Sequence, residues 1–226
     1  MATQEPNLRS HAIEDYAKAI YVLETRGSNP VSTNALAERL GVTPGSVSAM
    51  VKKLDDAELV THTPYRGVRL TAAGRRTALE VIRHHRLLEL FLAEVLEMPW
   101  DRVHQEAEVL EHVLSTELEE IIAAKLGNPT HDPHGDPIPT PDFEIEERET
   151  HSLADLEPGD QGVFVRVSDA DSEMLRYLDE RGVRPGAHLE VIERQPFGGP
   201  LFVRVGSDVH PLGGDLAQAM RVEVSA

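Results

Sequence analysis

The 226-residue sequence contains no cysteine. This absence excludes disulfide bonds and thiolate metal sites, and it fits the reducing environment of the cytoplasm. The sequence also lacks the roughly 20 consecutive apolar residues that a membrane span needs, and its first residues lack the apolar run of a signal peptide. Because 40% of the residues are hydrophobic, the chain can bury a core. We therefore expect a soluble, cytoplasmic protein without a membrane partner.

Positive charge is scarce as well, since the formal net charge is −17. This balance argues against a nucleic-acid partner, because DNA affinity depends largely on neutralising phosphates. The acidic residues are, however, unevenly distributed. Residues 1–76 hold 10 Lys and Arg against 8 Asp and Glu, whereas residues 77–226 hold 12 against 31. The first segment therefore remains able to bind DNA.

Hydrophobic periodicity predicts three helices in this first segment, at about 11–26, at 33–40 and from Thr43-Pro44 onward. Gly41 ends the second helix, and Thr43 and Pro44 suit the N-cap and first turn of the third. Two short strands follow, around a turn at 65–67. Two short helices followed by a β-hairpin form a winged helix-turn-helix. The sequence thus predicts a DNA-binding domain over residues 1–76.

The side chains expected to face DNA lie at the start of the third helix and on the wing. The small residues among them let the backbone approach closely but offer few base contacts, while the cationic ones suit phosphate groups. DNA shape is therefore expected to carry much of the sequence preference. A winged helix that binds only protein is the alternative. The predicted DNA-binding residues are Thr43, Pro44, Gly45, Ser46, Ser48, Lys52, Lys53, Tyr65 and Arg66.

The remainder divides into two further predicted domains. Residues 77–140 are expected to form an all-α domain, with helices at about 72–95, 100–111 and 115–126 and a Pro-rich loop that starts at 128. Residues 141–150 read as a linker. Residues 151–226 combine β-rich segments and turns with one helix at 172–181, which predicts a small β-barrel. The expected fold class is α+β.

The densest group of potential metal ligands is His104-x3-Glu108-x2-Glu111-His112, whose members would share one helix face. Burying these groups is costly unless they are paired or metal-bound. His85 and Glu89 form a second pair one helical turn apart, and the first helix offers an outward-facing aspartate. Oxygen and imidazole ligands suit Mn(II) or Fe(II), although other divalent transition metals remain compatible. His131, Asp132 and His134 also resemble ligands, but an ordered surface turn is the simpler interpretation.

Taken together, these segments resemble the diphtheria toxin repressor family of iron- and manganese-dependent regulators. The resemblance covers nearly the whole chain and is carried by EDYxKAIYxLE, VSTNALAERLGVTPGSVSAMVKKL, RHHRLLELFL, HxEAExxEH and DPHGDPIP. Within the family the chain is most similar to actinobacterial manganese transport regulators that keep a third domain. The resemblance implies a homodimer formed by the helical domain, an SH3-like (FeoA-type) barrel and a double-stranded DNA operator, with no organic small-molecule substrate.

The resemblance also implies two metal sites. The first would use Asp15, Glu108, Glu111 and His112. The second would use His85, Glu89 and His104 with side chains of the barrel, for which Asp171 and Glu173 are the best candidates and Asp169 competes.

Two departures from the family pattern bear on the metal. Iron-responsive members have Met in place of Asp15 and Cys in place of Glu108, so the oxygen ligands here favour manganese. Two-domain manganese regulators have a Glu ligand where this chain has Lys18. We expect a manganese-dependent repressor of metal-uptake genes, in which metal bridges the DNA-binding and helical domains. The residues expected at its dimer interface include Leu87, Leu88, Phe91, Val113 and Leu114.

Three alternatives remain. The chain could be an Fe(II)-dependent regulator of iron homeostasis genes. It could be a metallohydrolase with Glu111 as general base, although it has no HExxH pattern and the winged helix would then be unexplained. It could also buffer metal without binding DNA.

Overall fold

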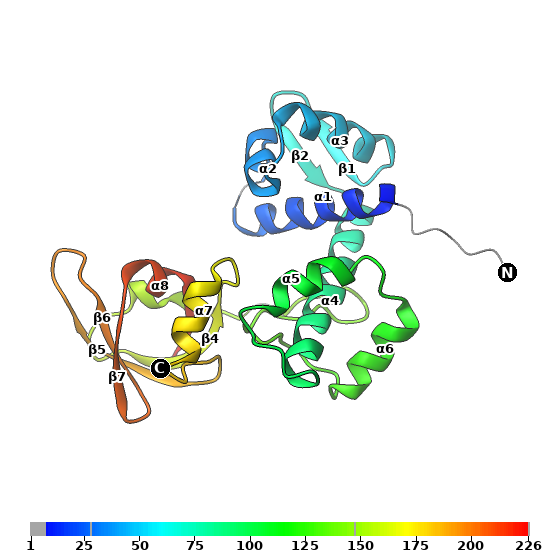
Figure 1. Ribbon diagram of the computed structural model, residues 1–226. Coiled ribbons are helices and arrows are strands. Elements are labelled where there is room, and N and C mark those ends of the chain that lie inside the picture. The colour runs from blue at the N-terminus through cyan, green and yellow to red at the C-terminus, as the bar shows by residue number, and fades with distance from the viewer. Residues whose placement is uncertain (1–7, 28, 147, 226) are drawn as a thin grey trace. The chain divides into compact units, whose positions relative to one another are not determined.

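The computed structural model describes residues 8–27, 29–146 and 148–225, which form two compact units (Figure 1). Unit 1 combines residues up to 85 with residues 109–119 and 139–144. Unit 2 combines residues 86–108 and 120–138 with the chain from 145 onward. Three helices, α4 (Ala72–Glu94), α5 (Val103–Leu110) and α6 (Thr116–Lys125), contribute residues to both units. No helix of the described residues is long and apolar enough to span a membrane.

Unit 1 contains the predicted winged helix. Its helices are α1 (Leu8–Thr25), α2 (Thr33–Leu40) and α3 (Pro44–Asp56), and β1 (Val60–Thr63) pairs antiparallel with β2 (Gly67–Leu70). Local chemistry sets the helix ends: Ser32 and Thr43 cap α2 and α3, and Gly41 ends α2 with φ of 64°. A small core includes Ile20, Leu36, Val47, Leu54 and Val68. The sequence therefore predicted the three helices and the hairpin of this part.

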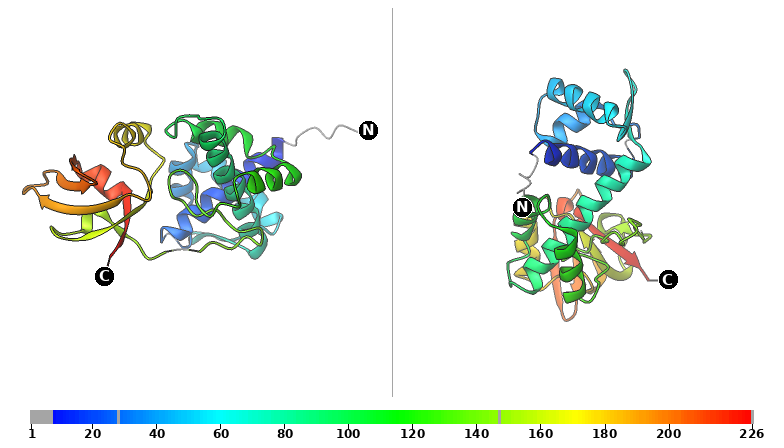
Figure 2. Two further views of the ribbon diagram at one scale, coloured as in Figure 1. Left: turned by 90° about the horizontal axis from the view of Figure 1, so that it is seen from below. Right: turned by 90° about the vertical axis from the view of Figure 1, so that its right-hand side faces the viewer.

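Unit 2 is dominated by a six-stranded antiparallel sheet in the order β3-β8-β4-β5-β6-β7. Register shifts in β4 and β5 mark irregularities of the kind that bend strands, and the turned views in Figure 2 show a curved sheet. Its helices are α7 (Ser172–Asp179) and α8 (Gly214–Ala219), with a 3₁₀ turn at Leu153–Asp155. The strands are β3 (His151–Ser152), β4 (Gln161–Val167), β5 (His188–Arg194), β6 (Leu201–Val205), β7 (Asp208–Leu212) and β8 (Met220–Val224).

The barrel elements missing from the sequence-based prediction include β7 and α8. The sequence of β7, DVHPL, contains a proline and polar residues, so it does not resemble a core strand. It lies at the edge of the sheet, where a proline is tolerated because one side of the strand needs no hydrogen-bond donors. The helix α8 is only 6 residues long, too short for a periodic signal.

The Pro-rich loop after α6 (Thr116–Lys125) docks on the barrel. The Asp132 carboxylate accepts the backbone N–H groups of His134 and Asp136 at 2.8 and 2.9 Å, which fixes a tight turn. The His134 carbonyl then accepts the N–H of Val167 on β4 at 2.9 Å. Nearby, Trp100 is 2% exposed and belongs to the hydrophobic core of the barrel. The loop and the segment before α5 therefore pack against the barrel.

Candidate functional site

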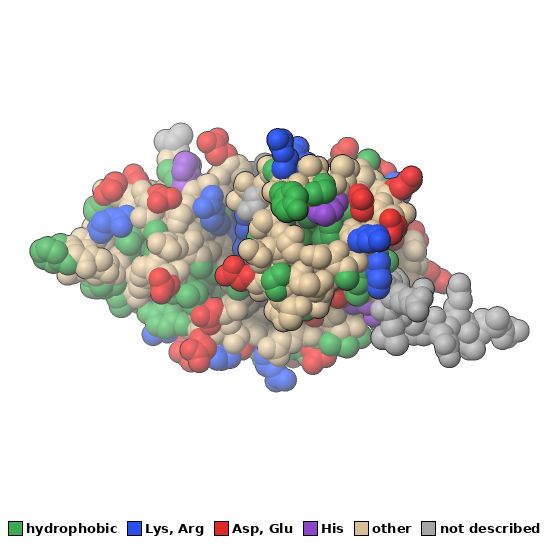
Figure 3. Space-filling model, turned by 90° about the horizontal axis from the view of Figure 1, so that it is seen from above, with side chains coloured by type: hydrophobic (Ala, Val, Ile, Leu, Met, Phe, Trp, Pro, Cys, Tyr) green, Lys and Arg blue, Asp and Glu red, His purple; other side chains and the backbone are tan. Residues whose placement is uncertain are grey.

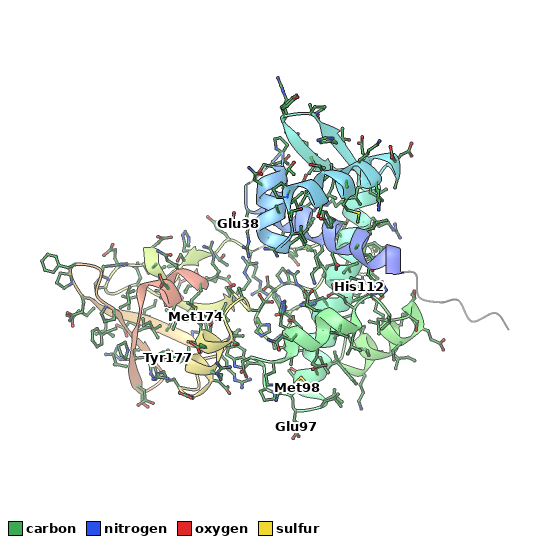
Figure 4. The ribbon with its side chains drawn as sticks, turned by 45° about the horizontal axis from the view of Figure 1, so that its top comes forward. Glu38, Glu97, Met98, His112, Met174 and Tyr177 are labelled. Carbon is green, nitrogen blue, oxygen red and sulfur yellow. The ribbon has the colours of Figure 1, made fainter. Side chains whose placement is uncertain are left out.

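The first cluster of potential ligands lies in unit 1 and joins α1 to the turn after α5. Asp15, Glu111 and His112 each offer a ligand atom within 4.8 Å of the others. His112 Nε2 is 2.9 Å from an Asp15 oxygen and 3.6 Å from a Glu111 oxygen. Figure 4 labels His112, which lies beside α1. We call these three residues the Asp15 cluster.

Burial makes the Asp15 cluster chemically distinctive. Glu111 is only 1% exposed, and both its carboxylate oxygens lie 2.9 Å from the Lys18 ammonium. Its Oε2 is also 2.5 Å from His85 Nδ1. A buried carboxylate is tolerated only with such compensation, because desolvation strongly disfavours its charge. His112 is held from the other side by Glu14, at 2.6 Å.

The prediction of a single ligand-bearing helix face was wrong in one respect. Helix α5 ends at Leu110, so Glu111 and His112 lie in the following turn instead of on the helix. The turn is held by a contact that the sequence did not predict: His84 Nδ1 is 3.1 Å from the Glu111 carbonyl, and its Nε2 is 3.1 Å from Glu119.

The second cluster lies in unit 2 and joins α4, α5 and the barrel. Glu89, His104 and Asp169, here called the Glu89 cluster, likewise offer ligand atoms within 4.8 Å of one another. His104 Nδ1 lies 2.9 Å from Asp169 and 3.2 Å from Glu89. The hydrogen bond to Asp169, followed by that to Glu89, raises the pKa of His104 to about 10. Burial by itself would raise the pKa of Asp169, but the hydrogen bond with His104, together with the charges of His104 and His134, lowers it.

The barrel contribution differs from the best sequence-based candidates. Asp171 caps α7, accepting the N–H groups of Glu173 and Met174 at 2.8 and 3.3 Å. The Glu173 side chain is 89% exposed. Asp169, the competing candidate from the barrel, contacts His104 instead. The physical reason is local: α7 begins at Ser172, so the preceding aspartate is used as its N-cap.

Two further predicted ligands lie at the edges of these clusters. His85 is one helical turn before Glu89 on α4, and its ring contacts Glu111. The Glu108 side chain is 43% exposed, with Oε1 3.9 Å from His104 Nε2.

The docked loop also contacts the Glu89 cluster. His134 is fully buried, with Nε2 2.8 Å from the Trp100 carbonyl and Nδ1 3.8 Å from Glu89. Burial alone would lower the pKa of His134, but Glu89 and Asp132 raise it to about 9. Burial also raises the pKa of Asp132. His131 is separate from them and pairs with Thr130 at 2.9 Å.

All nine predicted DNA-binding residues are exposed, from Thr43 at the start of α3 to Tyr65 and Arg66 on the wing. Figure 3 shows Lys and Arg side chains standing among carboxylates on the face seen from above. The hydroxyl groups at the start of α3 are partly engaged locally, since Thr43 accepts the Ser46 N–H at 3.2 Å and Ser48 donates to the Pro44 carbonyl at 3.0 Å. These local hydrogen bonds fix the orientation of the hydroxyl groups at the start of α3.

The apolar residues expected at a dimer interface divide into two groups. Leu87 and Leu88 are 0% and 5% exposed, so they pack within the chain's own core. Val113 is 56% exposed, and Val109 on α5 is 71% exposed. These two valines therefore leave an apolar surface in unit 1 that the single chain does not cover.

Family models match three consecutive parts of the chain. Residues 10–68 match the iron dependent repressor N-terminal DNA binding domain, residues 71–140 the iron dependent repressor metal binding and dimerisation domain, and residues 151–224 the FeoA domain.

Whole-chain relatives give the same picture. The chain is 34% identical to the iron-dependent repressor IdeR of Mycobacterium leprae (strain TN), with 93% of this chain and 96% of that protein covered. It is 30% identical to the diphtheria toxin repressor of Corynebacterium diphtheriae, with the same coverage of each chain. A solved manganese-dependent transcriptional repressor in complex with manganese is 42% identical, with a TM-score of 0.86 over 94% of this chain and 100% of that one.

Proposed function

The chain belongs to the family of metal-dependent transcriptional repressors that includes the diphtheria toxin repressor, and from this premise we propose that manganese is its activating metal. Members of this family are DNA-binding repressors rather than enzymes. We further propose that the manganese-loaded homodimer represses genes for metal uptake.

The observation that carries this proposal is the convergence of the Asp15 cluster. Two carboxylates and one imidazole meet within 4.8 Å, and the chain has no thiol to offer. Such a donor set fits Mn(II) and Fe(II) better than soft-ligand metals. The residues present therefore suit the divalent metal that the family uses.

We assign the ligands from both clusters. Asp15, Glu111 and His112 would hold one ion, with Glu108 as the further ligand expected from the sequence. Glu89, His104 and Asp169 would hold a second, with His85 as the additional predicted ligand. Asp169 replaces Asp171 and Glu173 in this assignment, because Asp171 caps α7 and Glu173 is exposed to solvent.

The Asp15 cluster also suggests how metal could control DNA binding. Asp15 belongs to α1 of the winged helix, whereas Glu111 and His112 belong to the turn after α5. A bound divalent ion would supply positive charge shared by both elements. Asp15 and His112 would then orient α1 relative to the helical domain, favouring the arrangement that fits DNA. In a homodimer this orientation sets the spacing of the two α3 helices, which must match two half-sites.

An Fe(II)-dependent regulator is the second candidate, because curated relatives at 34% identity are named iron-dependent repressors. The carboxylates of Asp15 and Glu108 favour manganese. Iron-responsive members of the family have Met and Cys at these two positions. DNA binding to native promoter fragments, titrated in gel shifts with Mn(II), anaerobic Fe(II) and Zn(II), separates the two. Equal DNA affinity with and without Mn(II) would overturn the proposal.

A double variant tests the ligand argument directly. Asp15→Met combined with Glu108→Cys should weaken the preference for Mn(II) over Fe(II) in the same titration. Glu106→Cys is a matched control, since Glu106 is an exposed carboxylate of the same helix. Metal binding without any gel shift would identify a metal-buffering protein instead.

A further inference from the structure

Lys18 lies beside the Asp15 cluster and contacts its Glu111, although an ammonium group cannot bind a metal ion. It follows Asp15 by about one turn on α1, and its side chain is 16% exposed. Its Nζ atom is 2.9 Å from each oxygen of Glu111 and 3.3 Å from His85 Nδ1. One side chain thus contacts two predicted metal ligands at once.

The contacts engage the groups that a metal would need. An ammonium donates to the same carboxylate lone pairs that a cation uses, and the Glu111 side chain is fully buried, so solvent cannot easily replace either partner. Charge-assisted hydrogen bonds of this kind are worth enough to change an equilibrium by about ten- to a hundredfold. Glu111 is therefore already charge-compensated before any metal arrives.

We propose that Lys18 is a built-in competitor cation, which holds Glu111 and His85 in the metal-free protein and must turn away before a metal ion can use them. This inference rests on the proposed metal-binding role of Glu111. Lys18 would then be a residue that sets the metal concentration needed for activation. Its contacts stabilise the metal-free state and must be broken when metal binds, so their presence lowers the apparent affinity for metal.

The geometry also predicts which substitutions matter. Removing the charge while keeping the length, as in Lys18→Met, abolishes the competition but leaves a buried carboxylate without its cation. Lys18→Gln keeps a hydrogen-bond donor for Glu111 without the positive charge. Lys125→Met removes one positive charge from an exposed position in the last turn of α6 and is a matched control for net charge.

The experiment measures Mn(II) binding to the full-length protein by isothermal titration and by the electron paramagnetic resonance signal of free Mn(II), in the absence of DNA. Urea unfolding of the metal-free protein is measured in parallel. We expect Lys18→Met to bind Mn(II) about ten- to a hundredfold more tightly and to be less stable than wild type without metal. Lys125→Met should match wild type in both measurements. If Lys18→Met does not fold without metal, Lys18→Gln carries the same expectation for affinity.

The inference is overturned if a folded Lys18 variant binds Mn(II) with wild-type or weaker affinity. That result would leave the proposed function intact, provided that Mn(II) still increases operator binding by the wild-type protein. If the wild-type protein itself neither binds Mn(II) nor responds to it, the proposed function fails first, and the role of Lys18 fails with it.

Discussion

Replacing Gly135 by alanine should detach the Pro-rich loop from the barrel. Gly135 has φ of +88°, and a Cβ atom there would lie 1.8 Å from the Val165 carbonyl oxygen and 2.8 Å from its carbon. Both are backbone atoms of β4, so the overlap cannot be relieved by a side-chain rotation. The loop would have to move away and lose the hydrogen bond between the His134 carbonyl and the Val167 N–H.

The expected cost follows from these contributions. An alanine in the left-handed region costs about 1–2 kcal/mol, and a lost buried backbone hydrogen bond costs about 1–3 kcal/mol. We therefore expect Gly135→Ala to lower the free energy of unfolding by about 3 kcal/mol or more. Gly127→Ala is the matched control, because Gly127 has φ of +77° with nothing within 4 Å of an added Cβ. Only the backbone contribution of about 1–2 kcal/mol applies there.

Urea unfolding followed by tryptophan fluorescence suits this comparison. Trp100 is the single tryptophan of the chain, and its ring stacks on His134 with centroids 5.6 Å apart. Gly135→Ala should therefore also change the native emission spectrum, whereas Gly127→Ala should not. Equal destabilisation by the two variants, with an unchanged spectrum, would refute the argument that the loop is rigidly held by β4.

Three further predictions test other parts of the molecule. Lys53→Ala on the exposed face of α3 should reduce the slope of log affinity for the operator against log salt concentration by about 1. The free energy of unfolding should change by less than about 0.5 kcal/mol. An unchanged slope would show that Lys53 does not contact DNA. Trp100→Ala should lower the free energy of unfolding, followed by circular dichroism, by about 3–5 kcal/mol. A smaller loss would show that the barrel core repacks to fill the cavity. Asp132→Asn keeps the turn-forming acceptor but removes a carboxyl group whose pKa is raised well above its ordinary range by burial. Because the pKa of Asp132 is higher in the folded than in the unfolded protein, the wild type loses stability as pH rises from the ordinary carboxyl range through that raised pKa. Asp132→Asn should therefore gain stability relative to wild type over this rise in pH, and the opposite trend in urea unfolding would contradict it.

Local chemistry explains which features could be predicted from the sequence. The helices of the winged helix begin and end at residues whose preferences act over one turn, such as Thr43 as an N-cap and Gly41 in the left-handed region. The alternating segments of the barrel could likewise be recognised, apart from the proline-containing edge strand β7. The chemical type of the candidate metal ligands followed from the sequence, because a chain without cysteine has no thiolate to offer and its clustered donors are carboxylates and imidazoles.

Only the tertiary structure decided which of these donors meet. Lys18 and Glu111 are 93 residues apart in the sequence, and no periodicity relates them. The choice of Asp169 over Asp171 depended on where α7 starts, a difference smaller than the uncertainty of a predicted helix boundary. The end of α5 at Leu110 moved Glu111 and His112 off the helix face. The sequence by itself thus determined the kinds of candidate ligand, whereas long-range packing decided their partners, because a buried charge must find its counter-charge wherever the fold brings one within reach.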